Sequence, residues 1–163
     1  MSDLREAVLG PLPPKPPQAA TLEVQDLSVT FPSRRGKVRA VVHASWRIEQ
    51  GKTLGVVGES GCGKSVAALA VMGLIDSPGR IDGGHIALRG TDIRRLSEAT
   101  MRRVRGREVA MIFQEPMTAL NPVLNVGEQV AEVLILHEGL RHEAAWRGAV
   151  DLLDQVGIPL PMK

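Results

Sequence analysis

One short stretch, GESGCGKS at residues 58–65, restricts the possible fold of this chain more than any other. It matches the pattern G-x-x-x-x-G-K-[ST], with Gly58, Gly63, Lys64 and Ser65 at the defined positions. Glycines let the backbone adopt positive φ angles and bring its N–H groups close together, which creates a concavity that binds anions. The pattern therefore predicts a loop that holds phosphate groups, placed between a strand and a helix.

The segments on both sides of this loop agree with that prediction. Thr53–Val57 is a short apolar run without strict alternation, which is typical of a strand covered on both faces in a parallel sheet. Lys64–Ile75 is rich in Ala, Leu and Met, which predicts a buried helix that stops at Asp76–Gly79. A flexible glycine-rich hairpin is the alternative interpretation of the loop, but it requires neither of these neighbours.

A nucleoside triphosphate would meet several complementary groups in such a loop. The positive end of the following helix and its unpaired N–H groups attract phosphate oxygens. Lys64 would contact the β- and γ-phosphates, and Ser65 would offer a hydroxyl ligand to Mg²⁺. The predicted nucleotide-binding residues are Gly58, Glu59, Ser60, Gly61, Cys62, Gly63, Lys64, Ser65 and Val66. Within this set, Cys62 is expected to be a small loop residue and not a catalytic thiol, because no His lies near it in sequence.

Composition excludes several other classes of protein. The chain has 163 residues, of which 44% are hydrophobic and 23% charged, as in globular domains. Its longest apolar stretch, Val66–Ile75, is too short to span a bilayer, which takes about 20 residues. The single Cys fits a reducing cytoplasm. Arginines cluster at 34–39 and 102–107, but no aromatic residues lie between them to stack on bases, so we expect no nucleic-acid partner.

Before the loop, the sequence predicts a tail followed by strands. Residues 1–20 include five prolines between positions 10 and 20, which predicts a Pro-rich tail, so the folded domain would run over 21–163. Alternating apolar residues predict strands at 22–31 and 38–48, joined by a turn at 32–37.

After the loop, the pattern continues with strands and then helices. The expected elements are short strands within 83–93, a helix over 91–106 broken near Ser97, a second covered strand at Val109–Phe113 and an ordered loop at Gln114–Pro122. Two further helices would present apolar faces, the first made of Val126, Val130, Val133, Leu134 and His137. The second would present Ala149, Leu152, Leu153 and Val156 and end at Gly157 and Pro159.

The order of these parts, with GESGCGKS followed later by QEPMTALNPVLNVGEQ, closely resembles the ATP-binding subunits of ABC transporters. The resemblance covers residues 22–157 and is specific to the importer branch for oligopeptides, dipeptides and nickel. It implies an α/β fold of the P-loop NTPase class, in its ABC-type ATPase form. That fold would have an N-terminal antiparallel β-subdomain and the start of a helical subdomain. It also implies ATP and Mg²⁺ as cofactors.

Two further site residues are implied only by the resemblance. Gln114 matches the Q-loop glutamine, which in the family contacts Mg²⁺ and the attacking water and links the nucleotide site to the membrane subunits. Its place after the predicted strand at 109–113 agrees with the rule that open α/β sheets bind ligands at the carboxyl ends of strands. Phe31 matches by spacing the aromatic residue that stacks on adenine, although a strand core residue is an equally good interpretation.

The resemblance also implies a location and partners. The chain would be a peripheral subunit at the cytoplasmic face of a bacterial inner membrane, and it would power import of peptides or similar small solutes. Its partners would be transmembrane permease subunits, a second ATPase subunit (identical or different) and, indirectly, a substrate-binding protein. Two alternatives remain open: a non-transport ABC-superfamily ATPase of DNA repair or chromosome organisation, and a nucleotide-binding regulatory fragment.

Several motifs of the family have no match in this sequence. These are the LSGGQ signature, the Walker B aspartate, the glutamate that serves as general base, and the switch histidine. We therefore expect residues 21–163 to be a partial, truncated ABC ATPase domain. It would contain no catalytic residue of its own and would not hydrolyse ATP alone.

Overall fold

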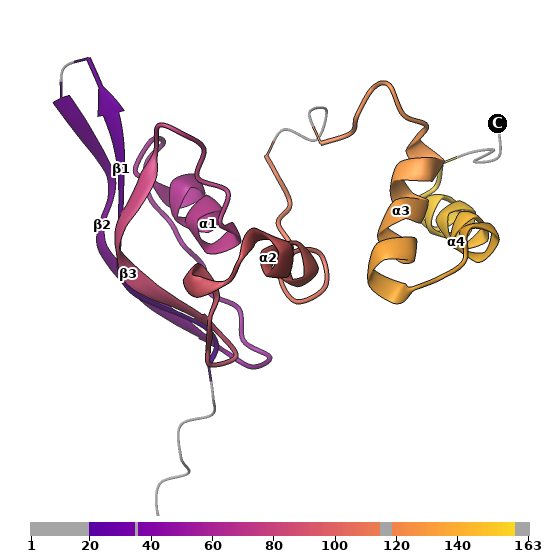
Figure 1. Cartoon of the computed structure of the whole chain (residues 1–163), viewed down its shortest axis with the longest axis horizontal. Helices are drawn as coiled ribbons and strands as arrows, with labels where there is room; N and C mark the ends of the chain where they lie inside the picture. Colours follow the sequence, from indigo (N-terminus) through magenta and orange to yellow (C-terminus); the bar gives the residue numbers. More distant parts are fainter. Residues whose placement is uncertain (1–19, 35, 115–118, 159–163) are drawn as a thin grey trace, which may run out of the picture. The chain divides into compact units, whose positions relative to one another are not determined.

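The computed structural model describes residues 20–34, 36–114 and 119–158. They belong to two compact units, and the boundary between the units in the chain lies between Arg95 and Leu96. The first unit contains a sheet and the glycine loop, and the second is helical (Figure 1). The predicted Pro-rich tail lies outside the described residues except for Ala20, which begins the first strand. Among the described helices, none is both long and apolar enough to cross a membrane.

An antiparallel sheet forms the main part of the first unit. Its strands are β1 (Ala20–Ser33), β2 (Gly36–Glu49), β3 (Arg80–Leu88) and β4 (Thr91–Asp92), in the order β2–β1–β3–β4. The strands predicted at 22–31 and 38–48 are confirmed, and both extend further than predicted. The strands predicted within 83–93 are also confirmed, with a turn at Arg89 and Gly90 between β3 and β4.

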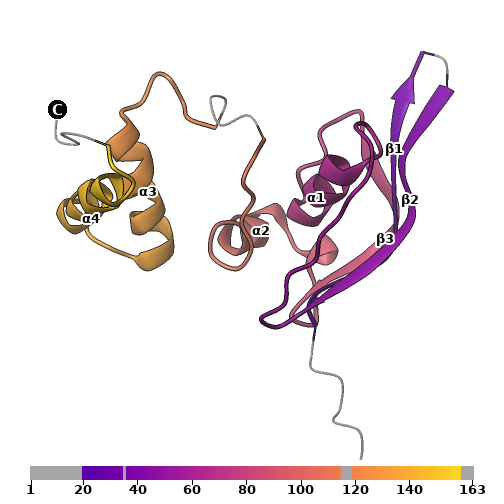
Figure 2. The same ribbon diagram turned by 180° about the vertical axis from the view of Figure 1, so that it is seen from behind.

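Helix α1 (Lys64–Met72) packs against β1 and β2 and lies beside one face of the sheet (Figures 1 and 2). The sheet contributes fully buried apolar side chains to the core of this unit, and the last turn of α1 is buried as well. These residues are Val24, Leu27, Val29 and Ile86 of the sheet and Ala70, Val71 and Met72 of the helix. The helix ends three residues earlier than predicted. Gly73 adopts φ 64°, and its N–H donates to the carbonyl of Ala70, which closes the last turn.

The two covered strands predicted from apolar runs are wrong. Thr53–Val57 and Val109–Phe113 form no strand, apart from an isolated bridge between Arg105 and Val109. Most of their apolar side chains are exposed, with Val57 at 93% and Ile112 at 98%, while Val109 and Met111 are half-buried. A strand needs neighbouring strands to pair its N–H and C=O groups, and the described residues place none beside either segment. The described sheet is consequently antiparallel throughout, and the parallel part of the predicted fold is not formed by these residues.

The predicted break near Ser97 is confirmed. The short helix η1 (Ile93–Arg95) precedes it, and α2 (Glu98–Val104) follows. Ser97 is the N-cap of α2, and its hydroxyl accepts a hydrogen bond from the Thr100 N–H at 3.3 Å. Arg105, at the other end of α2, forms a hydrogen-bonded salt bridge of 2.6 Å with Glu98. This bond from the guanidinium lowers the pKa of Glu98.

Helices α3 (Val126–Glu138) and α4 (His142–Gln155) pack together through alanines. Their shared core contains Ala131, Ala145 and Ala149, surrounded by partly buried Val130, Leu134, Ile135 and Trp146. Both helices exist as predicted, but their predicted faces are partly wrong. Val133, Leu152 and Val156 are exposed at 53%, 42% and 72%. Ala149 and Leu153 are buried as predicted. Ala131 and Ala145 take the other buried positions, because small side chains let the two helix backbones approach closely.

Removal of the α3 cap should have a measurable effect on stability. The Asn125 side chain accepts a hydrogen bond of 2.8 Å from the Gly127 N–H. We expect Asn125→Ala to lower the free energy of unfolding by about 1 kcal/mol, because it leaves an N–H of the first turn without a partner. Asn125→Ser keeps an oxygen acceptor and should stay within a few tenths of a kcal/mol of the native chain. Urea unfolding followed by circular dichroism measures both, and equal losses would show that the cap is not the cause.

Candidate phosphate-binding loop

The glycine loop follows the exposed segment 53–57 and leads directly into α1. Gly61 and Gly63 have φ angles of 81° and 95°, a region that residues with a Cβ atom seldom adopt. Gly63 is also the N-cap of α1, and a Cβ atom there would overlap the carbonyl oxygen of Ala40 in β2. Glycine is therefore required at Gly63 both by the backbone angle and by the close approach of β2.

Lys64 folds back over the loop. Its Nζ donates to the carbonyl oxygens of Gly58 at 2.7 Å and Glu59 at 2.8 Å, and it lies 3.4 Å from the Cys62 Sγ. An ammonium group has three donors, and a thiol sulfur is a weak acceptor. Two donors thus hold the lysine on the loop, and the third can bind a stronger acceptor such as a phosphate oxygen.

The first turn of α1 adds further donors for an anion. The first hydrogen bond of the helix runs from the Ala67 N–H to the Gly63 carbonyl oxygen at 2.9 Å. The N–H groups of the helix residues before Ala67 therefore have no carbonyl partner within the helix. No acidic residue lies in this turn, so no carboxylate opposes the positive end of the helix dipole. Ser65 is exposed in the same turn, and Val66 is half-buried.

The remaining loop residues give the loop its shape. The Cys62 N–H donates to the Glu59 carbonyl at 3.3 Å, which forms a turn across Ser60 and Gly61. Cys62 is exposed, and its Sγ packs against Gly58, where an added Cβ atom would approach it to 2.7 Å. The loop thus has glycine wherever a side chain would collide with Cys62 or with β2.

The other two predicted site residues lie apart from this loop in the chain. Phe31 is half-buried in β1, opposite Val38 of β2, and its ring packs against Gly79 of the turn before β3. Gln114 is exposed and belongs to the second unit. Adenine stacking on Phe31 and the pairing of Gln114 with Ser65 at a magnesium ion both stay predictions.

The sequence analysis missed the part that β2 plays in this site. Ala40 and Val41 pack against Gly63, with the Val41 Cγ2 within 3.5 Å of the position of a Cβ atom there. The signal in the sequence is weak, because strand periodicity shows which residues alternate but does not show which loop the strand will touch.

By sequence, the chain is similar to proteins of the ABC transporter family. The family model described as ABC transporter matches residues 41–162. The chain is 49% identical to the oligopeptide transport ATP-binding protein OppD of Bacillus subtilis, over 87% of this chain and 40% of that protein. It is also 49% identical to the dipeptide transport ATP-binding protein DppD of Escherichia coli, over 87% of this chain and 43% of that protein. The chain thus spans less than half the length of these relatives.

Solved structures agree on the fold. The ATP-binding cassette MJ0796, in a dimeric post-hydrolysis state bound to ADP and Pi, matches with a TM-score of 0.71 at 19% identity, over 82% of this chain and 56% of that one. This similarity shows that the chain has the α/β fold of ABC cassettes. The family match covers residues 41–162, most of the chain, and shows that the chain belongs to the ABC transporter family.

Proposed function

We propose that this chain is the MgATP-binding part of the ATPase subunit of an ABC importer for peptides or similar small solutes. The observation that carries the proposal is the position of the Lys64 ammonium group, held over the loop by two carbonyl oxygens beside the N-terminus of α1. An ammonium group and several free N–H groups around one small space suit a triphosphate, whose charge is spread over many oxygens.

Magnesium fits the same site. Ser65 is exposed in the first turn of α1, next to the lysine that would hold the β- and γ-phosphates, and hydroxyl oxygens are among the ligands that Mg²⁺ accepts. Gln114 would supply a second oxygen ligand and orient the attacking water. Bound Mg²⁺ would neutralise charge on the phosphates, while Lys64 and the helix N-terminus would hold the phosphates in place. Phe31 would stack on the adenine.

The relatives support an importer as the setting of this site. Two are named as oligopeptide and dipeptide transport ATP-binding proteins, and a third, of Salmonella typhimurium, as a glutathione import ATP-binding protein at 49% identity. We propose the same arrangement for this chain. It would act at the cytoplasmic face of a bacterial membrane, beside permease subunits and a second ATPase subunit, with a substrate-binding protein delivering the solute.

A chimera tests this proposal. The chain would replace its matching part in DppD of Escherichia coli, in a strain that lacks the native protein. We expect the chimera to restore dipeptide uptake, because this chain would supply the nucleotide loop and the Gln114 segment that we propose contacts the permease. A chimera that is stably expressed and binds MgATP but moves no dipeptide would count against the importer and leave the nucleotide site standing.

Gln114→Ala in the same chimera separates binding from coupling. We expect MgATP affinity to change by less than about threefold, because Lys64 and the helix N-terminus would still hold the phosphates. Dipeptide uptake should fall to background, because the link from nucleotide to permease is lost. Gln129→Ala is a control, since among the described residues this glutamine bonds to the Asn121 and Leu124 backbone in its own unit. Loss of MgATP binding in Gln114→Ala would show that its role is misassigned.

A further inference from the structure

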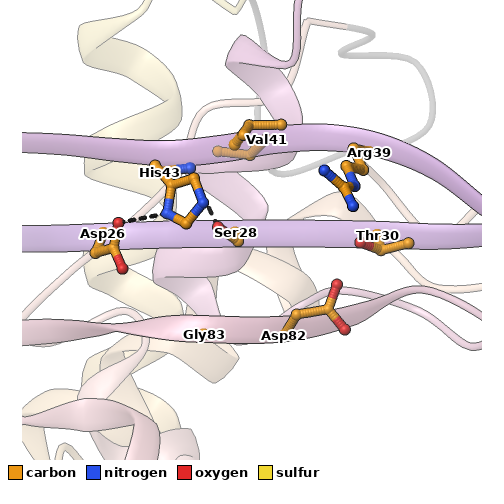
Figure 3. Close-up of a pocket in the computed structure, with 9 residues that line it drawn as sticks. Asp26, Ser28, Thr30, Arg39, Val41, His43, Asp82 and Gly83 are labelled. Atoms are coloured by element: carbon orange, nitrogen blue, oxygen red, sulfur yellow. Dashed lines mark hydrogen bonds and ion pairs between the residues drawn. The ribbon is translucent and has the colours of Figure 1, made fainter.

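A cavity of about 300 Å³ lies on the sheet of the first unit, and none of residues 58–65 line it. Its side chains come from three strands, β1, β2 and β3 (Figure 3). Asp26 and His43 occupy one end, and Arg39, Thr30 and Asp82 occupy the other. The volume is at the lower limit of small-molecule pockets, which measure roughly 300–1,000 Å³. The cavity is therefore of a size for one small solute.

The Asp26 end has an unusual backbone. Asp26 and His43 face each other across β1 and β2, and both have positive φ angles, 54° and 49°. The His43 Nδ1 lies 2.6 Å from the Asp26 Oδ1. The Ser28 hydroxyl accepts from the His43 N–H at 3.1 Å, and the Ser45 hydroxyl accepts from the Asp26 N–H at 2.9 Å. Strained backbone that side chains hold in place is concentrated at functional sites in proteins, which directs attention to this cavity.

The other end is lined by two side chains of opposite charge, Arg39 and Asp82, and Arg80 is bonded to Asp82. The Arg80 Nε donates to the Asp82 Oδ1 at 2.7 Å, and hydrogen bonds from Thr30 and Arg80 lower the pKa of Asp82, so its carboxylate stays ionised at neutral pH. Arg39 lies on the opposite side of β1, as Figure 3 shows. Within the described part of the chain, the Arg39 guanidinium has no ion-pair partner, and Asp82 pairs with Arg80 and not with Arg39.

We propose that this cavity binds a free α-amino acid with a polar side chain. Its carboxylate would pair with Arg39, whose planar group presents two parallel N–H donors to such a ligand. Its ammonium group would pair with Asp82. The Asp82 carboxylate has acceptor positions beyond its bonds to Arg80 and Thr30, and Arg39 has no ion pair among the described residues, so a molecule with both charges can pair with both side chains. The ligand's side chain would extend toward Asp26 and His43, which offer hydrogen-bonding groups.

Titration of the whole chain with L-glutamine, followed by amide NMR spectra, tests this site. We expect the amide signals of Ser28, Thr30 and Gly83 to shift in a saturable manner, while those of residues 58–65 do not. Arg39→Gln and Asp82→Asn should each weaken binding by about tenfold or more, the loss expected for one charge-assisted hydrogen bond. Lys52→Gln also removes a positive charge, but from an exposed turn outside the cavity, and should leave the affinity unchanged.

Any one of three results would overturn the proposal. The first is no shift of the cavity signals at millimolar L-glutamine, and the second is unchanged affinity in both charge variants. The third is equal binding of N-acetyl-L-glutamine, which lacks the ammonium group. Because Arg39 makes no ion pair in the described structure, Arg39→Gln should keep the native fold even if Asp82→Asn does not. MgATP binding, measured on the same samples, reports on the nucleotide loop alone. The proposed function and the proposed amino-acid site can therefore be disproved separately.

Discussion

Lys64→Ala is expected to weaken MgATP binding by at least about 100-fold. Each charge-assisted hydrogen bond contributes about 1.5–3 kcal/mol, and 1.4 kcal/mol corresponds to a factor of ten in affinity. The substitution would remove the lysine's contacts to the phosphates. It would also remove its bonds to the Gly58 and Glu59 carbonyl oxygens, at 2.7 and 2.8 Å, which hold the loop in shape. Calorimetric titration with a non-hydrolysable ATP analogue and Mg²⁺ measures the change.

Two variants control this experiment. Lys52→Ala removes a lysine from the exposed turn that precedes the loop, and should leave the affinity within about twofold of the native value. Lys64→Arg keeps the charge but replaces a compact ammonium group with a larger planar one, so we expect it to lose most of the binding as well. Equal affinities of the native chain and Lys64→Ala would mean that the loop does not hold the phosphates, and the proposed function would fail with it.

Parts of the fold that depend on neighbouring residues could be predicted from the sequence. Alternating side chains were enough to predict β1 and β2, which pair with each other and are joined by a single turn. The break at Ser97 is a local hydrogen bond between its side chain and the Thr100 N–H, and serine is a common N-cap. The need for glycine at position 61 is also a local property, because it follows from the φ angle of that residue alone.

Features that depend on distant residues could not be predicted in the same way. An apolar run such as Thr53–Val57 is compatible with a covered strand, but only neighbouring strands can complete its hydrogen bonds. The support of Gly63 by Ala40, and the meeting of Arg39 and Asp82 in one cavity, both depend on strand register. β1 contains several register shifts against its neighbours, and each shift changes which side chains share a face.

One of these irregular positions should be highly sensitive to substitution. Gly84 in β3 has φ 101° and lies against β1 where the register between these strands shifts. A Cβ atom there would be 2.6 Å from the Leu27 Cα, 2.7 Å from the Gln25 carbonyl oxygen and 2.8 Å from the Asp26 carbonyl carbon. All three are backbone atoms of a central strand, and Leu27 is fully buried, so none can move aside without disturbing the core. We expect Gly84→Ala to lower the free energy of unfolding by about 3–5 kcal/mol, combining backbone strain and overpacking.

The neighbouring glycine is a matched control for this prediction. Gly83 carries the same substitution in the same strand, but an added Cβ atom would meet nothing within 4 Å, and its φ is not positive. Gly83→Ala should change the free energy of unfolding by less than about 1 kcal/mol, and it can stabilise, because alanine has less backbone freedom than glycine in the unfolded chain. Urea unfolding of the two variants under identical conditions compares them directly. If both lost the same stability, the close packing of β3 on the shifted register of β1 could not be the reason that glycine is needed at Gly84.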